Sequence, residues 1–420
     1  MTTSVGKVLA AVRSLLAGGG AFIVGNSLLG IVLPLRMAAA EYPVMLIGLV
    51  MAAYYAGLAL GGNYGKRIIL RVGHIRAFAA FAAVLATTAL AYPMLFTAVA
   101  WIALRFINGF CIAGLQATIE SWLNDRSSNA TRGRVLGLYM MTFYLAVASG
   151  QVLVNVADVD GPELFMLAAA LIALALVPVA LTSLGAPALA GHRRLSVRTL
   201  YANSPVGVVG AGVAGMLVGS FYGLGVVFAR GIGLDVAQSA LFMTMVVVGG
   251  FGFQWPIGML ADRFDRRIVL AAVLTMVGVA WAFVAFASVS ALSLPTLLGL
   301  AVLFGGAISS VYPICVAQAF DRLDRAHYVS ASGRLLMIYA LGAMAGPLLA
   351  SAVMAVRGPY SFFAFESVVA VGFAVFVGYG VWRRPPIPAD QQEPFVAVSS
   401  VTPVAADLDP RCDGPAARPV

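Results

Sequence analysis

Long apolar runs, separated by short polar connections, follow one another along most of the chain. Most runs reach the ~20 residues that a helix needs to cross the hydrocarbon of a bilayer. The pattern therefore predicts twelve membrane-spanning helices, and an even number returns the chain to the side on which it starts. The predicted spans lie near residues 15–38, 44–64, 76–96, 98–122, 135–157, 163–185, 203–228, 236–260, 267–289, 294–319, 330–354 and 359–382.

Positive charge divides the connections between these runs into two populations. Of the 26 Lys and Arg residues, all but Arg36, Arg105, Arg230 and Arg357 lie on alternate connections or near the chain ends. Loops kept in the cytoplasm carry an excess of Lys and Arg, so the alternation predicts which side each loop faces. Both termini are expected in the cytoplasm beneath a bacterial inner membrane. The basic connections around residues 66–76, 126–134, 193–198, 263–267 and 322–334 are expected on the same side.

The composition agrees with a multi-pass membrane protein. Hydrophobic residues make up 61% of the chain and charged residues 10%, and a soluble protein this apolar could not cover its surface. The net charge of +9 follows from the topology, which argues against nucleic-acid binding, since that needs a solvated basic face. The three cysteines indicate no disulfide framework. Residues 385–420 are Pro-rich and slightly acidic, which predicts a disordered cytoplasmic tail.

A six-span unit is used twice. The residues Gly-Arg-Val-Leu at 133–136, followed by Tyr139, recur as Gly-Arg-Leu-Leu at 333–336, followed by Tyr339, and six spans separate them. Parallel repeats of this kind are related by an axis along the membrane normal, and the two halves can rock about a central site. The sequence therefore predicts an all-α integral membrane protein of two six-helix bundles. The bundles are expected at residues 1–185 and 203–384, joined by a cytoplasmic loop at 186–202.

Several motifs resemble the major facilitator superfamily. Trp-Pro-Ile-Gly-Met-Leu-Ala-Asp-Arg-Phe-Asp-Arg-Arg at 255–267 is similar to the signature loop of that family, with Asp265 where the second Gly usually stands. Arg105-Phe-Ile-Asn-Gly109 matches the family's Arg-x-x-x-Gly pattern in the fourth span. Together with the segments at 120–124, 131–136 and 312–317, these motifs resemble the YcaD-like bacterial subfamily. The resemblance covers residues from about 20 to 382 and implies the facilitator fold and solute transport.

Two departures from the family pattern narrow the expected function. The first-half signature loop at 61–76 lacks the acidic residue. The fifth span carries Ala-Ser-Gly-Gln at 148–151, where proton-driven drug exporters usually carry a Gly-Pro pair. Drug export is consequently not indicated.

Arg105 is the strongest candidate for a functional residue. It lies about 8 residues, or roughly 12 Å, inside its span, and no acidic side chain of the same helix can reach it. A permanent charge at that depth is costly unless it faces a cavity, a partner or backbone carbonyls. The functional interpretation is a cavity-facing cation that holds an anionic group or tunes a proton site. The structural alternative is that it binds carbonyls of neighbouring helices.

Polar residues within the spans are few, and they usually turn toward the protein interior. Some should therefore line a pathway, although each could equally join two helices by hydrogen bonds. This small number of polar residues favours a moderately apolar or singly charged organic solute over a sugar. Glu366, near the outer end of the last span, is expected to serve packing or protonated burial rather than proton transport. The candidate pathway residues are Asn26, Gln116, Gln151, Asn155, Tyr222, Gln254, Trp255 and Tyr312, with Arg105.

Two charged clusters are candidates for a cytoplasmic gate. Asp262, with Arg263, Arg266 and Arg267, is expected to act as a latch that meets a helix N-terminus in the other half, because helix N-termini attract carboxylates. The alternative is a solvated topology signal. A second cluster at the inner end of the fourth span is expected to form a salt-bridged gate, against the alternative of a solvated patch worth little. Its members are Glu120, Arg132 and Arg134, and Arg334 repeats the last position in the second half.

The leading hypothesis is a secondary transporter that moves a small organic solute by alternating access, coupled to protons, with uniport and solute exchange as the alternatives to this coupling. The alternatives are a transport-inactive receptor or sensor on the same fold, and a membrane-embedded enzyme. An enzyme would need a clustered nucleophile, His or metal set, and the sequence offers none. No cofactor, metal or nucleic acid is expected. The expected partners are the solute, protons and the lipid bilayer, and the expected state is a monomer.

Overall fold

The computed structural model describes residues 5–128, 131–181, 195–286, 293–383, 385–388, 391–398, 400, 402, 404 and 408–412. Across these residues the regular structure is helical, and twelve helical segments are long and apolar enough to cross a membrane. Both findings confirm the predicted fold class. The sixth span consists of α6 and α7, and the fifth continues from α5 into η1. The ends predicted for the sixth and ninth spans lie partly outside the described residues.

The first half contains α1 (Val5–Ala39), α2 (Val44–Val72), α3 (His74–Met94), α4 (Ala98–Asp125), α5 (Arg132–Val152), η1 (Leu153–Val156), α6 (Glu163–Leu174) and α7 (Leu176–Ala180). The short α8 (Val197–Asn203) follows within the predicted connecting loop. The second half contains α9 (Pro205–Gly231), α10 (Val236–Arg263), α11 (Arg266–Phe286), α12 (Leu294–Phe320), η3 (Arg325–His327), α13 (Tyr328–Arg357) and α14 (Ser361–Arg383). The short η6 (Pro410–Cys412) lies in the C-terminal tail.

Local sequence signals set several helix ends. Asp235 caps α10 by accepting from the backbone N–H of Gln238 at 2.7 Å, and the Gln238 side chain accepts in return from Asp235 at 3.1 Å. This reciprocal capping box satisfies two backbone donors that a helix N-terminus otherwise leaves unpaired. Gly73 ends α2 with a φ of 85°, a conformation that glycine adopts without steric cost.

The two halves pack their helices in the same pattern. In the first half α1 packs on α5, α2 on α4 and α3 on α6; in the second α9 packs on α13, α10 on α12 and α11 on α14. Close approach depends on small residues: a Cβ on Gly57 of α2 would overlap the carbonyl oxygen of Phe106 of α4. A Cβ on Gly249 of α10 would likewise overlap that of Val302 of α12. The repeated pairing matches the internal duplication in the sequence.

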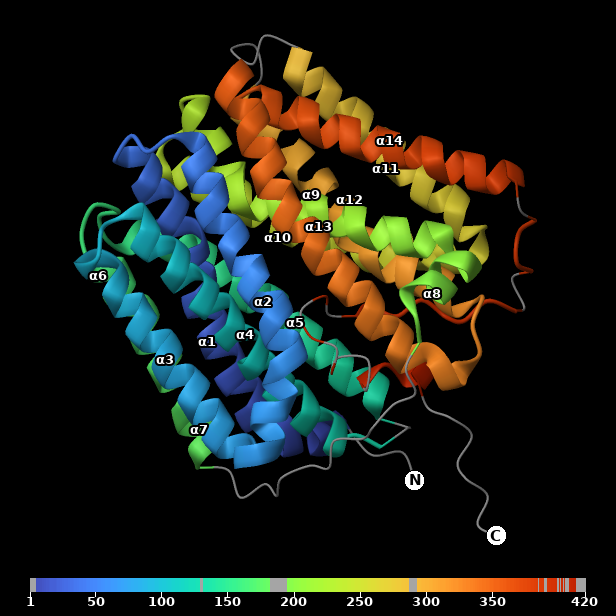
Figure 1. Ribbon diagram of the computed structural model, residues 1–420, viewed down its shortest axis with the longest axis horizontal. Coiled ribbons are helices and arrows are strands. Elements are labelled where there is room, and N and C mark those ends of the chain that lie inside the picture. The colour runs from blue at the N-terminus through green and yellow to red at the C-terminus, as the bar shows by residue number, and fades with distance from the viewer. Residues whose placement is uncertain are drawn as a thin grey trace.

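The halves form two bundles that meet along α2 with α13, α5 with α10, and α1 with α9. We call the end that carries the α2–α3, α4–α5, α10–α11 and α12–α13 connections the basic end, and the other the opposite end. At the opposite end Gly48 of α2 fits tightly against Ser351 and Pro347 of α13. From there α2 and α13 diverge toward the basic end, as Figure 1 shows.

The described part of the C-terminal tail lies in this divergence. Figure 1 shows the red segment leaving α14, running back beneath the second bundle and reaching the gap between α13 and α5. Its side chains include Thr402, Leu408 and Asp409, which are 2%, 0% and 1% exposed. For these residues the structure corrects the expected disorder. The composition suggested too little apolar surface for folding, but the bundles supply the surface against which the tail packs.

Candidate functional site

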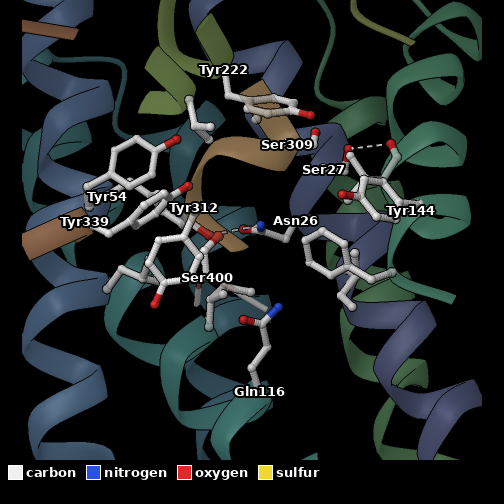
Figure 2. A pocket seen from close by; sticks show the side chains of 18 of the residues that line it. Asn26, Ser27, Tyr54, Gln116, Tyr144, Tyr222, Ser309, Tyr312, Tyr339 and Ser400 are labelled. Atoms are coloured by element: carbon white, nitrogen blue, oxygen red, sulfur yellow. Dashed lines mark hydrogen bonds between the residues drawn. The ribbon is translucent and has the colours of Figure 1, made fainter. Parts of the chain in front are cut away.

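A cavity of about 210 Å³ lies between the two halves (Figure 2). Helices α1, α2, α4 and α5 of the first half and α9, α10, α12 and α13 of the second contribute to its wall, together with two residues of the tail. The structure thus brings together side chains far apart in the sequence. Seven of the candidate pathway residues line it: Asn26, Arg105, Gln116, Gln151, Tyr222, Gln254 and Tyr312.

Arg105 is buried in the wall of this cavity and only 3% exposed. Its guanidinium lies over the ring of Tyr54, 4.6 Å from the centroid, and its Nη1 donates to Asn108 Oδ1 at 3.3 Å. Its Nε has no hydrogen-bond partner, and within the described residues no carboxylate forms an ion pair with it. A buried guanidinium that keeps an unused donor beside a cavity can bind an anionic or strongly accepting group.

Three amide side chains in the wall have unpaired carbonyl oxygens. These are Asn26 Oδ1, Gln116 Oε1 and Gln151 Oε1, all buried without a partner. Asn26 uses its amide nitrogen instead, to donate to the Tyr54 hydroxyl at 3.3 Å. Buried polar atoms in folded proteins are nearly always hydrogen-bonded, so a group of such orphans around one cavity indicates the place of a ligand or of ordered water.

Gln254 differs from these amides because it is engaged across the interface. Its Oε1 accepts from the Tyr144 hydroxyl at 3.1 Å, and its Nε2 donates to the carbonyl oxygen of Ser309 at 2.9 Å. Tyr144 lies on α5 of the first half, and the other two residues lie on α10 and α12 of the second. This chain of hydrogen bonds joins the halves at the wall of the cavity.

Six tyrosines line the cavity, and sequence reasoning named only two of them. Figure 2 shows Tyr54, Tyr312 and Tyr339 gathered around Ser400, with Tyr144 across the cavity. A hydropathy pattern counts Tyr as apolar, although its hydroxyl needs a partner when it is buried. Applying to Tyr the criterion used for Asn and Gln would have found the others. The full set is Tyr54, Tyr55, Tyr144, Tyr222, Tyr312 and Tyr339.

Two of the candidate pathway residues lie elsewhere. Trp255 is 68% exposed, because it follows Gln254 on α10 and a helix turns successive side chains apart. Asn155 is exposed and borders a separate hollow at the opposite end, beside Asp158 and Arg230. The sequence gives the span of each residue but not which side of the helix faces the interior.

Asp262 lies at the basic end, but its partners differ from the expected ones. Its carboxylate accepts from the backbone N–H of Phe395 in the tail at 2.9 and 3.0 Å and from Arg266 at 3.2 Å. Arg266 also pairs with Asp321 at 3.4 Å. The halves diverge at this end, so Asp262 meets the tail here. The expected contact with a helix N-terminus of the first half stays a prediction for an arrangement in which this end is closed.

The remaining arginines of the predicted latch behave differently from one another. Arg267 pairs with Asp265 at 2.6 Å and donates to the carbonyl oxygen of Gly380 at 3.1 Å, while Arg263 is exposed. Burial alone would raise the pKa of Asp265, but the hydrogen bonds from Arg267 hold it below its ordinary value. Burial raises the pKa of Asp321 to about 6, against the opposing charge of Arg266.

Glu120 is fully buried near the basic end of α4. It accepts from the Tyr139 hydroxyl at 3.0 Å and from the hydroxyl of Thr402 in the tail. Arg132 and Arg134 lie on the first turn of α5 at the same end. Arg334, which repeats Arg134 in the second half, donates to the carbonyl oxygen of Leu195 at 3.0 Å.

Glu366 is fully buried on α14, where it accepts from the Ser220 hydroxyl of α9. It is not part of the cavity wall. This position agrees with the expected role in packing between helices.

Comparisons with solved structures show the same fold. The nucleoside transporter NupG superimposes with a TM-score of 0.69 at 15% identity, covering 88% of this chain and 97% of that one. A bacterial homologue of the human lysosomal transporter Spinster, described as inward-facing and occupied, gives 0.72 at 13% identity over 93% and 99%. The D-xylose-proton symporter gives 0.66 at 15% identity over 91% and 99%.

The sequence is also similar to curated transporters. The MFS-type transporter YcaD of Escherichia fergusonii is 26% identical over 345 residues, covering 82% of this chain and 88% of the relative. The MFS-type transporter YE1530 of Yersinia enterocolitica is 28% identical over 393 residues, covering 91% and 97%. The family model of the Major Facilitator Superfamily matches residues 15–200 and 207–406. The chain belongs to the Major Facilitator Superfamily.

Proposed function

We propose that this transporter moves a small organic solute through the central cavity by alternating access, as a secondary transporter. The observation that carries the proposal is the cavity itself, which lies between two matching halves and is surrounded by unpaired polar atoms. A rocking motion of the halves would expose this cavity to each side of the membrane in turn.

The wall chemistry defines a solute class. Arg105 offers a buried cationic donor, and the carbonyl oxygens of Asn26, Gln116 and Gln151 accept hydrogen bonds. The tyrosine rings present flat apolar faces with hydroxyl groups at their tips. The solute that fits carries an anionic group for Arg105, a planar or apolar body and one or more hydrogen-bond donors. This class is more polar than the solute expected from the thin set of polar residues in the sequence.

Orientation and location follow from the arginine pattern. We place the basic end and both termini in the cytoplasm and the protein in the bacterial inner membrane, as a monomer. In that orientation the halves are packed together on the outer side and diverge on the cytoplasmic side. The arrangement then corresponds to the inward-facing half of the transport cycle.

Proton coupling is part of the proposal, and Glu120 is the carboxylate that we assign to it. The described residues of the cavity wall include no carboxylate. Glu120 is buried on the same helix as Arg105, and its hydrogen bond to Tyr139 connects α4 with α5. The Glu120→Gln variant should transport the solute without a response to a pH gradient.

The test is a screen for solute uptake by the purified protein in proteoliposomes, with and without a pH gradient. Aromatic and heterocyclic carboxylates are the first compounds to assay. Uptake of one of them identifies a transporter. Binding without flux under any gradient would instead favour a receptor on the same fold, and turnover of the compound would favour an enzyme.

Arg105→Ala should abolish uptake while leaving membrane insertion intact, because the anionic group loses its counter-charge. Arg230→Ala is the matched control: this arginine is exposed at the end of α9 and bonds to the carbonyl oxygen of Leu234. Uptake at the normal rate by Arg105→Ala would show that Arg105 does not bind the anionic group of the solute.

A further inference from the structure

The C-terminal tail contacts the second bundle beside the residues that were predicted to form the cytoplasmic gate. The backbone N–H of Glu393 donates to Asp321 at 2.9 Å, and that of Phe395 donates to Asp262. The Glu393 carboxylate pairs with Arg325 at 2.9 Å. Two side-chain carboxylates, at the ends of α12 and α10, thus accept hydrogen bonds from the backbone of the tail, and main-chain hydrogen bonds contribute affinity when an extended peptide docks.

Apolar contacts accompany these polar ones. The ring of Phe395 lies so close to Gly258 of α10 that a Cβ at this glycine would overlap it. Val398, Val404 and Leu408 are 8%, 6% and 0% exposed. The tail therefore buries its own apolar side chains against the bundles, and removing this apolar surface from water favours docking.

The middle of the tail reaches the solute cavity. Val398 and Ser400 belong to the cavity wall, and Figure 2 shows Ser400 beside Tyr312 and Tyr339. Two residues further on, the Thr402 hydroxyl donates to Glu120 of the first bundle. The tail thus crosses from the second bundle to the first along the basic end of the cavity.

The chain then folds back on itself. Arg411 pairs with Asp409 at 2.6 Å, stacks on Phe320 of α12 with 4.8 Å to the ring centroid, and donates to the carbonyl oxygen of Pro394 at 3.2 Å. Arg411 and Asp409 are 4% and 1% exposed. These contacts of Arg411 hold the end of the described tail against α12 and against the earlier part of the tail.

We propose that the C-terminal tail is a tethered plug that docks between the two bundles and closes the solute cavity at its basic end. Because the plug covers the cavity at its basic end, it blocks the route by which a solute enters or leaves on that side. Its covalent attachment keeps its effective concentration high, so a solute passes this end only while the tail is released. Transport is therefore restrained by the tail until it leaves.

Docking also depends on the state of the transporter. The tail contacts Asp262 and Asp321 of the second bundle and Glu120 of the first at the same time. When the bundles close at the basic end, the space between these contacts disappears. The plug therefore binds only the conformation that is open at this end and stabilises it by that difference in affinity.

The test measures access to the cavity and needs no knowledge of the solute. The reporter is Val147→Cys, on the cavity wall, in a chain whose three native cysteines are replaced. A charged, membrane-impermeant maleimide is added to vesicles of either orientation. We expect labelling from the basic end to be at least about tenfold faster in a chain that ends at Pro388 than in the full chain, because an effect of this size corresponds to the loss of one or two charge-assisted hydrogen bonds.

Point variants guard against a truncated chain that fails to fold. Phe395→Ala combined with Thr402→Val should also speed labelling, since it removes one contact on each bundle. Gln391→Ala is the matched control on an exposed tail residue and should label at the parent rate. A synthetic peptide of residues 391–412 should slow labelling of the truncated chain again. Parent-like labelling of the truncated chain or of the double variant would overturn the plug.

The proposed closure depends only on the cavity, whereas its effect on transport depends on the proposed function. These experiments can reject the closure and the transport function separately. Tail-dependent labelling in a protein that transports no solute would keep the plug and reject the transport proposal. Solute uptake with tail-independent labelling would reject only the plug.

Discussion

The two ends of the cavity are closed by different kinds of contact. At the opposite end α2 and α13 touch directly, with Gly48 seated against Ser351 and Pro347. At the basic end the same helices diverge (Figure 1), and described residues of the tail contact both bundles there. A helix contact through a glycine is an integral part of the fold, whereas a tail held by backbone hydrogen bonds and a few side chains can leave without unfolding either bundle. The difference indicates which closure is regulated separately from the rocking of the bundles.

The largest expected effect comes from filling the contact at the opposite end. Gly48→Leu would force a side chain into Ser351 and Pro347, and overpacking of this kind costs about 1–3 kcal/mol. An equilibrium between conformations would then shift by roughly 5- to 150-fold toward opening at that end. Labelling of Val147→Cys from the opposite end should rise accordingly. Gly137→Leu is the matched control, since a Cβ at Gly137 meets nothing within 4 Å. Equal labelling of the two variants would show that the glycine contact does not hold the cavity closed.

A smaller effect is expected at the basic end from Asp262→Asn. The change weakens a charge-assisted acceptor of the Phe395 N–H and removes the ion pair with Arg266. A neutral acceptor contributes about 0.5–1.5 kcal/mol where a charged one contributes about 1.5–3 kcal/mol, and each 1.4 kcal/mol is a factor of ten, so labelling from the basic end should rise by about tenfold. Combined with the tail truncation, the substitution should add little. A full additional rise in the truncated chain would mean that Asp262 seals the cavity through the bundles rather than through the tail.

The sequence was sufficient for the fold and for part of the cavity, for physical reasons. Span length and arginine alternation reflect the bilayer itself, so twelve spans could be predicted from residue order alone. Arg105 and four amides could be identified because polar groups in hydrocarbon turn inward. The rotation of Asn155 and Trp255 depends on helix packing, which the sequence does not encode locally. The docking surface of the tail is assembled from α10, α12 and α4, so residues 385–420 alone could not reveal it.

The central claim is that the bundles open the two ends of one cavity in turn. Spin-label distances measured across both ends test it most directly, with Arg71→Cys and Asp324→Cys at the basic end, and Ala40→Cys and Val356→Cys at the opposite end. All four residues are exposed, and each pair joins the two bundles. The account predicts two distance populations at each end, with Gly48→Leu lengthening the opposite-end distance and shortening the basic-end distance. Distances that stay fixed at both ends, or that lengthen together, would contradict it.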